Sequence, residues 1–110
     1  MPFQTPEDVL THYQQYFSSE QAQDLNLTAQ LHLEGEGGGD WAFRIADGAL
    51  TTERGTIENP DFALEATVAD FLAMANGQLD PMKAYFTGRV RFHGSMRQAM
   101  RLMNRFRFNP

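Results

Sequence analysis

The segment from Asn76 to Met96 constrains the fold most strongly, because its 21 residues contain the boundaries of three successive elements. Gly77 is predicted to end one helix, since glycine adopts the left-handed conformation without a Cβ penalty. Asp80 before Pro81 predicts the start of a second helix, with aspartate as the N-cap and proline at the first helical position. Gly88 is predicted to end that helix, so the segment contains a short helix between two breaks.

A short strand and a last helix are predicted to follow. Residues 89–93 alternate polar and apolar side chains, which is typical of a half-buried strand. Ser95 and Gln98 form a capping-box pattern at the start of a helix over residues 96–105. The inner, apolar face of this helix is predicted to consist of Met96, Ala99, Met100, Met103 and Phe106.

Upstream of this segment, the pattern predicts two helices that flank four strands. One helix starts at Thr5 and the other at Thr67, and a further helical turn is expected over 21–24. Alternation of apolar and polar residues predicts strands over 27–34, 41–46, 49–54 and 62–66. We therefore expect an α/β (α+β) fold with a mostly antiparallel sheet of about five strands and helices on one face. The first four strands are expected to form a meander, with the fifth beside an existing edge.

Length and charge restrict the classes of function. The 110 residues fit one domain, 1–110, and the formal net charge of −5 argues against nucleic-acid binding. All 14 acidic residues lie at or before Asp80, whereas seven basic residues lie after it, which predicts a face that attracts anions. Cysteine, a secretory signal and an apolar stretch of about 18 residues are all absent, so a cytoplasmic location is expected.

No combination of residues predicts catalysis. His12, His32 and His93 show no helical metal-ligand spacing and are expected to be structural or solvated. No serine lies in a nucleophile elbow, and Ser95 is explained as a helix cap. We therefore expect no catalytic residue, no metal and no cofactor, and we expect that the chain is not an enzyme.

Methionine is concentrated in the last third of the chain. Apart from Met1, every methionine lies between Met74 and Met103, interleaved with aromatic residues. Two interpretations stay open from this pattern: an ordinary core under a sheet, or a deformable apolar site that repacks around variable guests. Each CH₂ moved out of water contributes about 0.8 kcal/mol, so an acyl chain would bind such a site without designed polar contacts.

Several short motifs also follow one another in a specific order. They are Phe71-Leu72-Ala73-Met74, Gly77-Gln78-Leu79-Asp80-Pro81, Ala84-Tyr85-Phe86, Gly88-Arg89-Val90-Arg91-Phe92, Gly94-Ser95-Met96 and Ala99-Met100. Together with residues 43–48 and 59–61, this order resembles the sterol carrier protein 2 (SCP2) family of lipid-binding domains, in a bacterial, stand-alone form. The likeness extends over most of the chain.

The resemblance implies an apolar cavity that holds lipid between the sheet and the C-terminal helices. The implied function is non-catalytic binding and transfer of a fatty acyl chain, a sterol-like molecule or a polyprenyl lipid in an apolar tunnel. The implied lining consists of Trp41, Phe43, Ile45, Phe71, Met74, Phe86, Val90, Phe92, Met96, Met100, Met103 and Phe106.

A second interpretation keeps the same fold but changes the role. The resemblance also includes accessory or scaffold proteins that present a lipid intermediate to enzymes, for example in ubiquinone biosynthesis. An enzyme partner or a homodimer would then join the lipid as a partner of this chain.

Three arginines, Arg97, Arg101 and Arg105, repeat every four residues along the last predicted helix. Such a stripe is either a solvated helix face or a contact for anionic membrane and lipid head groups. A cation near an anionic membrane surface contributes about 1 kcal/mol, so three of them would favour transient membrane contact.

Overall fold

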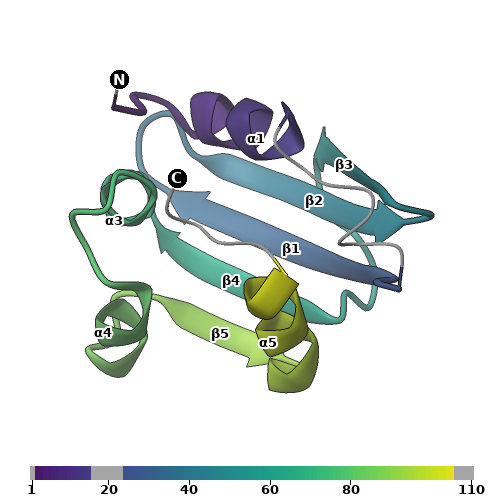
Figure 1. The fold of residues 1–110 in the computed structure, drawn as a ribbon. Helices are drawn as coiled ribbons and strands as arrows, with labels where there is room; N and C mark the ends of the chain where they lie inside the picture. Colours follow the sequence, from purple (N-terminus) through teal and green to yellow (C-terminus); the bar gives the residue numbers. More distant parts are fainter. Residues whose placement is uncertain (1, 16–23, 106–110) are drawn as a thin grey trace.

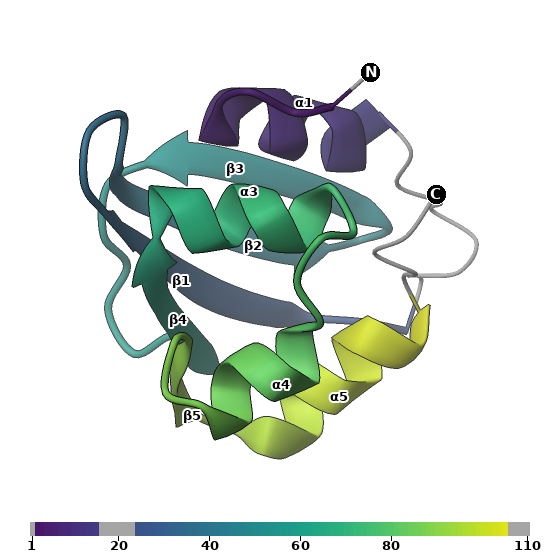
Figure 2. The same ribbon diagram turned by 90° about the vertical axis from the view of Figure 1, so that its left-hand side faces the viewer.

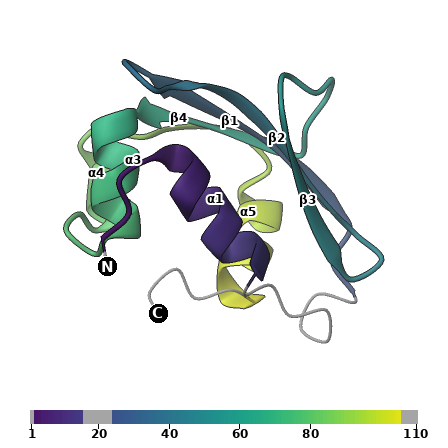
Figure 3. The ribbon, with the colours of Figure 1, turned by 90° about the horizontal axis from the view of Figure 1, so that it is seen from above.

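The computed structural model describes residues 2–15 and 24–105, with side chains described through Leu102. In that part of the chain, one sheet contains strands β1 (Leu27–Glu34), β2 (Gly39–Ala46), β3 (Ala49–Arg54), β4 (Phe62–Thr67) and β5 (Arg91–Gly94) (Figure 1). Helices α1 (Pro6–Gln15), α3 (Val68–Ala75), α4 (Pro81–Phe86) and α5 (Met96–Arg105) lie on the same face of the sheet (Figure 3). The predicted α+β fold, with about five strands and helices on one face, is confirmed. We call the opposite face of the sheet the outer face.

The predicted helix starts are confirmed by their caps. Side-chain oxygens of Thr5, Thr67, Asp80 and Ser95 each accept a hydrogen bond from a backbone N–H two or three residues further on, at 3.1–3.2 Å. These bonds satisfy donors that the first turn of a helix leaves unpaired. The helical turn expected over 21–24 lies, except for Asp24, outside the described residues.

The strand order β3-β2-β1-β4-β5 shows that the expected four-strand meander is wrong. β1, β2 and β3 do form a meander through two antiparallel pairs. β4, however, pairs with β1 in parallel instead of continuing beside β3. β5 then pairs antiparallel with β4, which places it at an edge as predicted.

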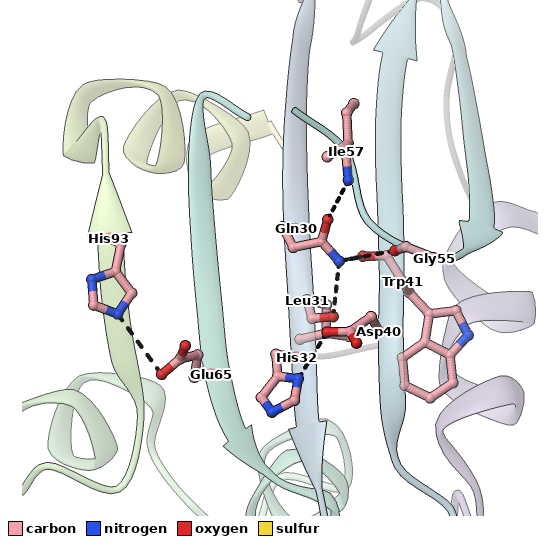
Figure 4. A network of polar contacts seen from close by, with 9 residues as sticks. All are labelled: Gln30, Leu31, His32, Asp40, Trp41, Gly55, Ile57, Glu65 and His93. Carbon is pink, nitrogen blue, oxygen red and sulfur yellow. Dashed lines mark hydrogen bonds and ion pairs between the residues drawn. The ribbon is translucent and has the colours of Figure 1, made fainter. Parts of the chain in front are cut away.

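Hydrogen bonds to β1 hold the connection between β3 and β4 on the outer face. The Gln30 amide donates to the carbonyl oxygen of Gly55 at 3.0 Å and accepts from the Ile57 N–H at 2.8 Å (Figure 4). Further along, the Asp61 carboxylate accepts from the Thr28 N–H at 2.8 Å. The chain is thereby carried across β1, so that β4 reaches its unpaired edge.

Gly94 lies at the junction of β5 and α5, where the backbone approaches β4 closely. Its φ is +105°, and a Cβ at this position would lie 2.6 Å from the carbonyl oxygen of Asp61 and 2.8 Å from the Cα of Phe62. The same Asp61 carbonyl accepts a hydrogen bond from the Ser95 N–H at 2.7 Å. The start of α5 is therefore fixed against β4 at a distance that only glycine permits.

Candidate functional site

The strand residues that the resemblance implies as lining share one apolar floor, formed by the helix-facing side of the sheet. Strand pairing places Trp41, Leu31, Leu64 and Phe92 in one row, and Phe43, Ala29 and Phe62 in the next. The rings of Phe62 and Phe92 are stacked, with centroids 5.7 Å apart. Sequence reasoning did not single out Leu64 and Phe62 as lining, although their alternation on β4 was the available signal.

Two groups of helices cover this floor. One core cluster packs beneath α1, α3 and α4, and it contains the predicted residues Trp41 and Val90, with Phe71 and Met74 half-buried against it. The other packs beneath α5 and contains Ile45, with Phe92 half-buried against it. Phe43 is half-buried and borders both clusters. The floor is therefore continuous beneath both groups.

The predicted residues on α4 and α5 are exposed instead. Phe86 exposes 76% of its surface, Met96 44% and Met100 43%. The face of α5 that packs on the sheet contains Ala99 and Leu102. The prediction that Met96 and Met100 lie on the inner face is therefore wrong, because their stripe runs beside that of Ala99 and Leu102 on a helix of 3.6 residues per turn. The side chains of Met103 and Phe106 lie outside the described residues.

Helix α4 exposes two further large side chains, Met82 and Tyr85, which sequence reasoning did not assign to the site. They are 46% and 39% exposed, whereas Ala84 between them is fully buried. A helix of six residues has room for little more than one inward contact. The short spacing from Pro81 to Gly88 was therefore the signal for this exposure.

We call these exposed side chains the α4–α5 apolar surface. Both helices lie at the β5 side of the molecule, with α4 beside the start of β5 and α5 beside its end (Figures 1 and 2). The surface consists of Met82, Tyr85, Phe86, Met96 and Met100.

The arginines of the α5 stripe differ in the contacts that they make. The Arg101 guanidinium donates to Gln98 Oε1 at 3.2 Å and to the carbonyl oxygen of Asp24 at 3.3 Å. Arg97 is exposed and has no ion partner among the described residues. The side chain of Arg105 lies outside the described part. Arg97 is therefore the described member of the stripe that is free to meet an anion.

The outer face is polar, and it contains two of the three histidines. His32 Nδ1 lies 2.8 Å from Asp40 Oδ1, and His93 Nε2 lies 3.8 Å from Glu65 Oε2 (Figure 4). Across residues 2–15 and 24–105, no group of three or more His, Cys, Asp or Glu side chains could hold a metal ion.

A pocket of about 190 Å³ opens near the end of β4, and its lining includes Glu34, Glu65, Asp70, Arg89 and Arg91. Arg89 Nη2 donates to Asp70 Oδ1 at 2.6 Å, which raises the pKa of Arg89. A lining of charged groups disfavours an apolar guest. The pocket is therefore unsuited to an acyl chain.

The contact between His32 and Asp40 predicts a dependence of stability on pH. The side-chain hydrogen bond to Asp40 raises the pKa of His32 above its ordinary value of 6.5. Because the pKa is higher in the folded chain, protonation of His32 favours folding. This contribution should be complete below about pH 6.5 and should disappear as the pH rises through the raised pKa.

Urea unfolding of the wild type and His32→Gln across this range would measure the effect. We expect a small effect, because the two side chains are 40% and 39% exposed. Asp40→Asn, which removes the charged acceptor, should give the same loss of pH dependence. A wild-type pH profile in both variants would contradict the assignment.

Among the described residues, no helix combines the length and hydropathy needed to cross a bilayer.

Comparison with known proteins identifies the family. The model of the SCP-2 sterol transfer family matches residues 8–107. Human sterol carrier protein 2 is 31% identical over 98 residues, in a match that covers 71% of this chain and 18% of the human protein. The chain thus spans less than a fifth of that relative's length.

Solved structures share the fold at lower sequence identity. The crystal structure of sterol carrier protein 2 like 2 from Aedes aegypti matches with a TM-score of 0.74 and 17% identity, over 89% of this chain and 93% of that one. A structure named UbiJ-SCP2 ubiquinone synthesis protein matches with a TM-score of 0.68 and 8% identity, over 90% of each chain. Together with the family match over nearly the whole length, they lead to one conclusion: this chain belongs to the SCP-2 sterol transfer family.

Proposed function

We propose that this protein is a non-catalytic lipid carrier, which binds one acyl chain, sterol-like molecule or polyprenyl lipid between the sheet and the C-terminal helices. Membership of the SCP-2 sterol transfer family supports this role. The observation that carries it is the apolar floor, where Phe43, Leu64 and Phe92 stay only half-buried beneath the helices, together with the large apolar side chains exposed on α4 and α5. Exposed apolar surface of this kind marks interaction sites in soluble proteins.

The proposed lining combines the floor with the exposed methionines of α5. Phe43, Phe92 and Leu64 are half-buried, so part of each ring or side chain is still accessible above the strands. Met96 and Met100 are exposed on α5, whose Ala99 and Leu102 pack in the same cluster as these strand residues. The unbranched thioether side chain adapts to guests of different shape. Each buried CH₂ of a guest contributes about 0.8 kcal/mol, so chain length should govern affinity.

The test is the substitution Met100→Arg, measured by titration with a fluorescent fatty acid. A cation in an apolar site has no partner there, so we expect affinity to fall by more than about tenfold. Because Met100 is 43% exposed, the substitution should leave urea unfolding cooperative.

The matched control is Thr51→Arg, which adds the same cation at an exposed position of β3. This variant should bind the fatty acid like the wild type. Wild-type affinity in Met100→Arg would refute the proposed lining, and equal loss in both variants would indicate an effect of net charge alone.

A second candidate is an accessory protein that presents a lipid intermediate to enzymes. The shared fold with the UbiJ-SCP2 ubiquinone synthesis protein favours this candidate. Purification from the host with an affinity tag would test it, since enzymes of one biosynthetic route should then co-purify in fixed proportion. In either role the protein would act in the cytoplasm.

A further inference from the structure

We infer that the α4–α5 apolar surface docks onto an anionic membrane, with Phe86 as the side chain that inserts among the lipids. The inference rests on the proposed lipid-carrier function and assigns the surface through which a lipid would enter. It differs from the arginine-stripe prediction, because the leading contact is an apolar side chain of α4.

Phe86 exposes a larger fraction of its surface than any other large apolar side chain in the described part of the protein. It is 76% exposed at the last position of α4, and the ring of Tyr85 lies beside it with centroids 5.6 Å apart. Aromatic side chains of this kind are favoured where one end meets hydrocarbon and the other meets water. The position of Phe86 therefore suits insertion below the head groups.

The backbone holds this projection in a defined place. Asp80 Oδ1 accepts from the Met82 N–H at 3.1 Å at the start of α4, and the Thr87 N–H donates to the Lys83 carbonyl at 2.9 Å at its end. Ala84 is fully buried and packs in the first core cluster. α4 thus presents Phe86 without needing to unfold or rotate.

Charge next to the surface identifies the partner. Lys83 on α4 and Arg97 on α5 are exposed and have no ion partner within residues 2–15 and 24–105, whereas Arg89 pairs with Asp70 and Arg91 lies 3.9 Å from Glu65. No acidic residue follows Asp80 in the sequence, so both helices lack acidic side chains of their own. Apolar side chains flanked by unpaired cations are complementary to anionic lipid.

A second copy of the chain fits this surface less well. In a two-fold dimer the same patch faces itself, which would bring Lys83 and Arg97 close to their own symmetry mates. Like charges in such a contact oppose association. A membrane presents negative charge and hydrocarbon together, as the surface requires.

The experiment is co-sedimentation with vesicles of phosphatidylcholine, with and without phosphatidylglycerol. We expect binding only to the anionic vesicles, and weaker binding as salt rises. Phe86→Ala should weaken partitioning by about tenfold, because it removes most of one inserted aromatic side chain. The double variant Lys83→Glu/Arg97→Glu should weaken it by more than about tenfold, because two attractive charges become repulsive.

Fluorescence can locate the inserted side chain directly. The single tryptophan, Trp41, is only 3% exposed, so its emission should change little when vesicles are added. The tryptophan introduced by Phe86→Trp starts in water and should shift to shorter wavelength on anionic vesicles. Binding to vesicles without this shift would overturn the assignment of Phe86.

Arg44→Glu is the matched control for the single variant Arg97→Glu, because Arg44 is an exposed arginine on the outer face of β2 and both substitutions change the net charge equally. It should lower vesicle binding far less than Arg97→Glu. An equal loss of vesicle binding would show that net charge, and not this surface, governs the interaction. Vesicle binding by Phe86→Ala at the wild-type level would overturn the inference. The inference would also be overturned if the wild type bound an acidic protein but did not bind anionic vesicles.

Fatty-acid titration without vesicles separates this inference from the proposed function. Lys83→Glu/Arg97→Glu should bind the soluble fatty acid like the wild type while losing vesicle binding. Loss of fatty-acid binding in Met100→Arg with unchanged vesicle binding would support the carrier alone. Wild-type fatty-acid binding in every variant, with vesicle binding lost in Phe86→Ala, would support the docking surface alone.

Discussion

Gly94→Ala should lower the free energy of unfolding by about 2–4 kcal/mol, because the new methyl group has no space and the backbone is in the wrong region for alanine. The Cβ would lie 2.6 Å from a backbone carbonyl oxygen and 2.8 Å from a Cα of β4, and neither atom can move as a flexible side chain does. Relief requires β5 and the start of α5 to separate from β4. Urea unfolding followed by circular dichroism would measure the loss.

Gly55→Ala separates the two causes of that loss. Gly55 also has a positive φ, of +127°, but a Cβ there would have nothing within 4 Å. This variant should therefore lose only the conformational part, about 1–2 kcal/mol. Equal losses in the two variants would show that close approach to β4 contributes nothing at Gly94.

Trp41→Ala should be at least as damaging, with a loss of about 3–5 kcal/mol on urea unfolding. Trp41 is 3% exposed in the first core cluster, where it forms part of the floor beneath the helices. Its ring also lies 4.4 Å from the guanidinium of Arg54, which in turn contacts Glu7 of α1 at 2.9 Å. Removing the indole would leave a cavity and remove the contact of β2 with the Arg54–Glu7 pair.

Trp41→Phe is the conservative comparison. It keeps an aromatic ring in the core and over the guanidinium, so we expect a loss of less than about half that of Trp41→Ala. Phe86→Ala should change stability little, since Phe86 is largely exposed. A loss in Trp41→Ala no larger than that in Phe86→Ala would mean that the core does not depend on this residue.

Local signals made the elements predictable. Alternation located the strands, and Thr67, Asp80 and Ser95 marked the helix starts by side chains that do cap the first turn. The resemblance, carried by motifs such as Gly88-Arg89-Val90-Arg91-Phe92, correctly indicated the family and the layered fold.

Two features were predicted wrongly, because they depend on contacts between distant parts of the chain that the sequence does not show. The connection that leads β4 to its parallel pairing with β1 is held by hydrogen bonds of Gln30 and Asp61, and these residues have the pattern of ordinary surface positions. The α5 methionines are exposed because the stripe of Ala99 and Leu102 packs on the sheet, and not the adjacent stripe of Met96 and Met100. Both stripes are apolar, so the sequence alone does not show which one packs on the sheet. Periodicity gives the angle between stripes but not the direction of the sheet.

The crossover between β3 and β4 has a consequence for the order in which the sheet assembles. Thr28 and Asp61, which it brings together, are 33 positions apart, whereas β2 and β3 are joined by a tight turn. Closing a long loop costs more entropy than closing a hairpin, and non-local strand pairs slow folding. We therefore expect β1, β2 and β3 to pair early in folding. β4 should pair with β1 later, once the Gln30 amide has formed its hydrogen bonds with Gly55 and Ile57 in the connection between β3 and β4.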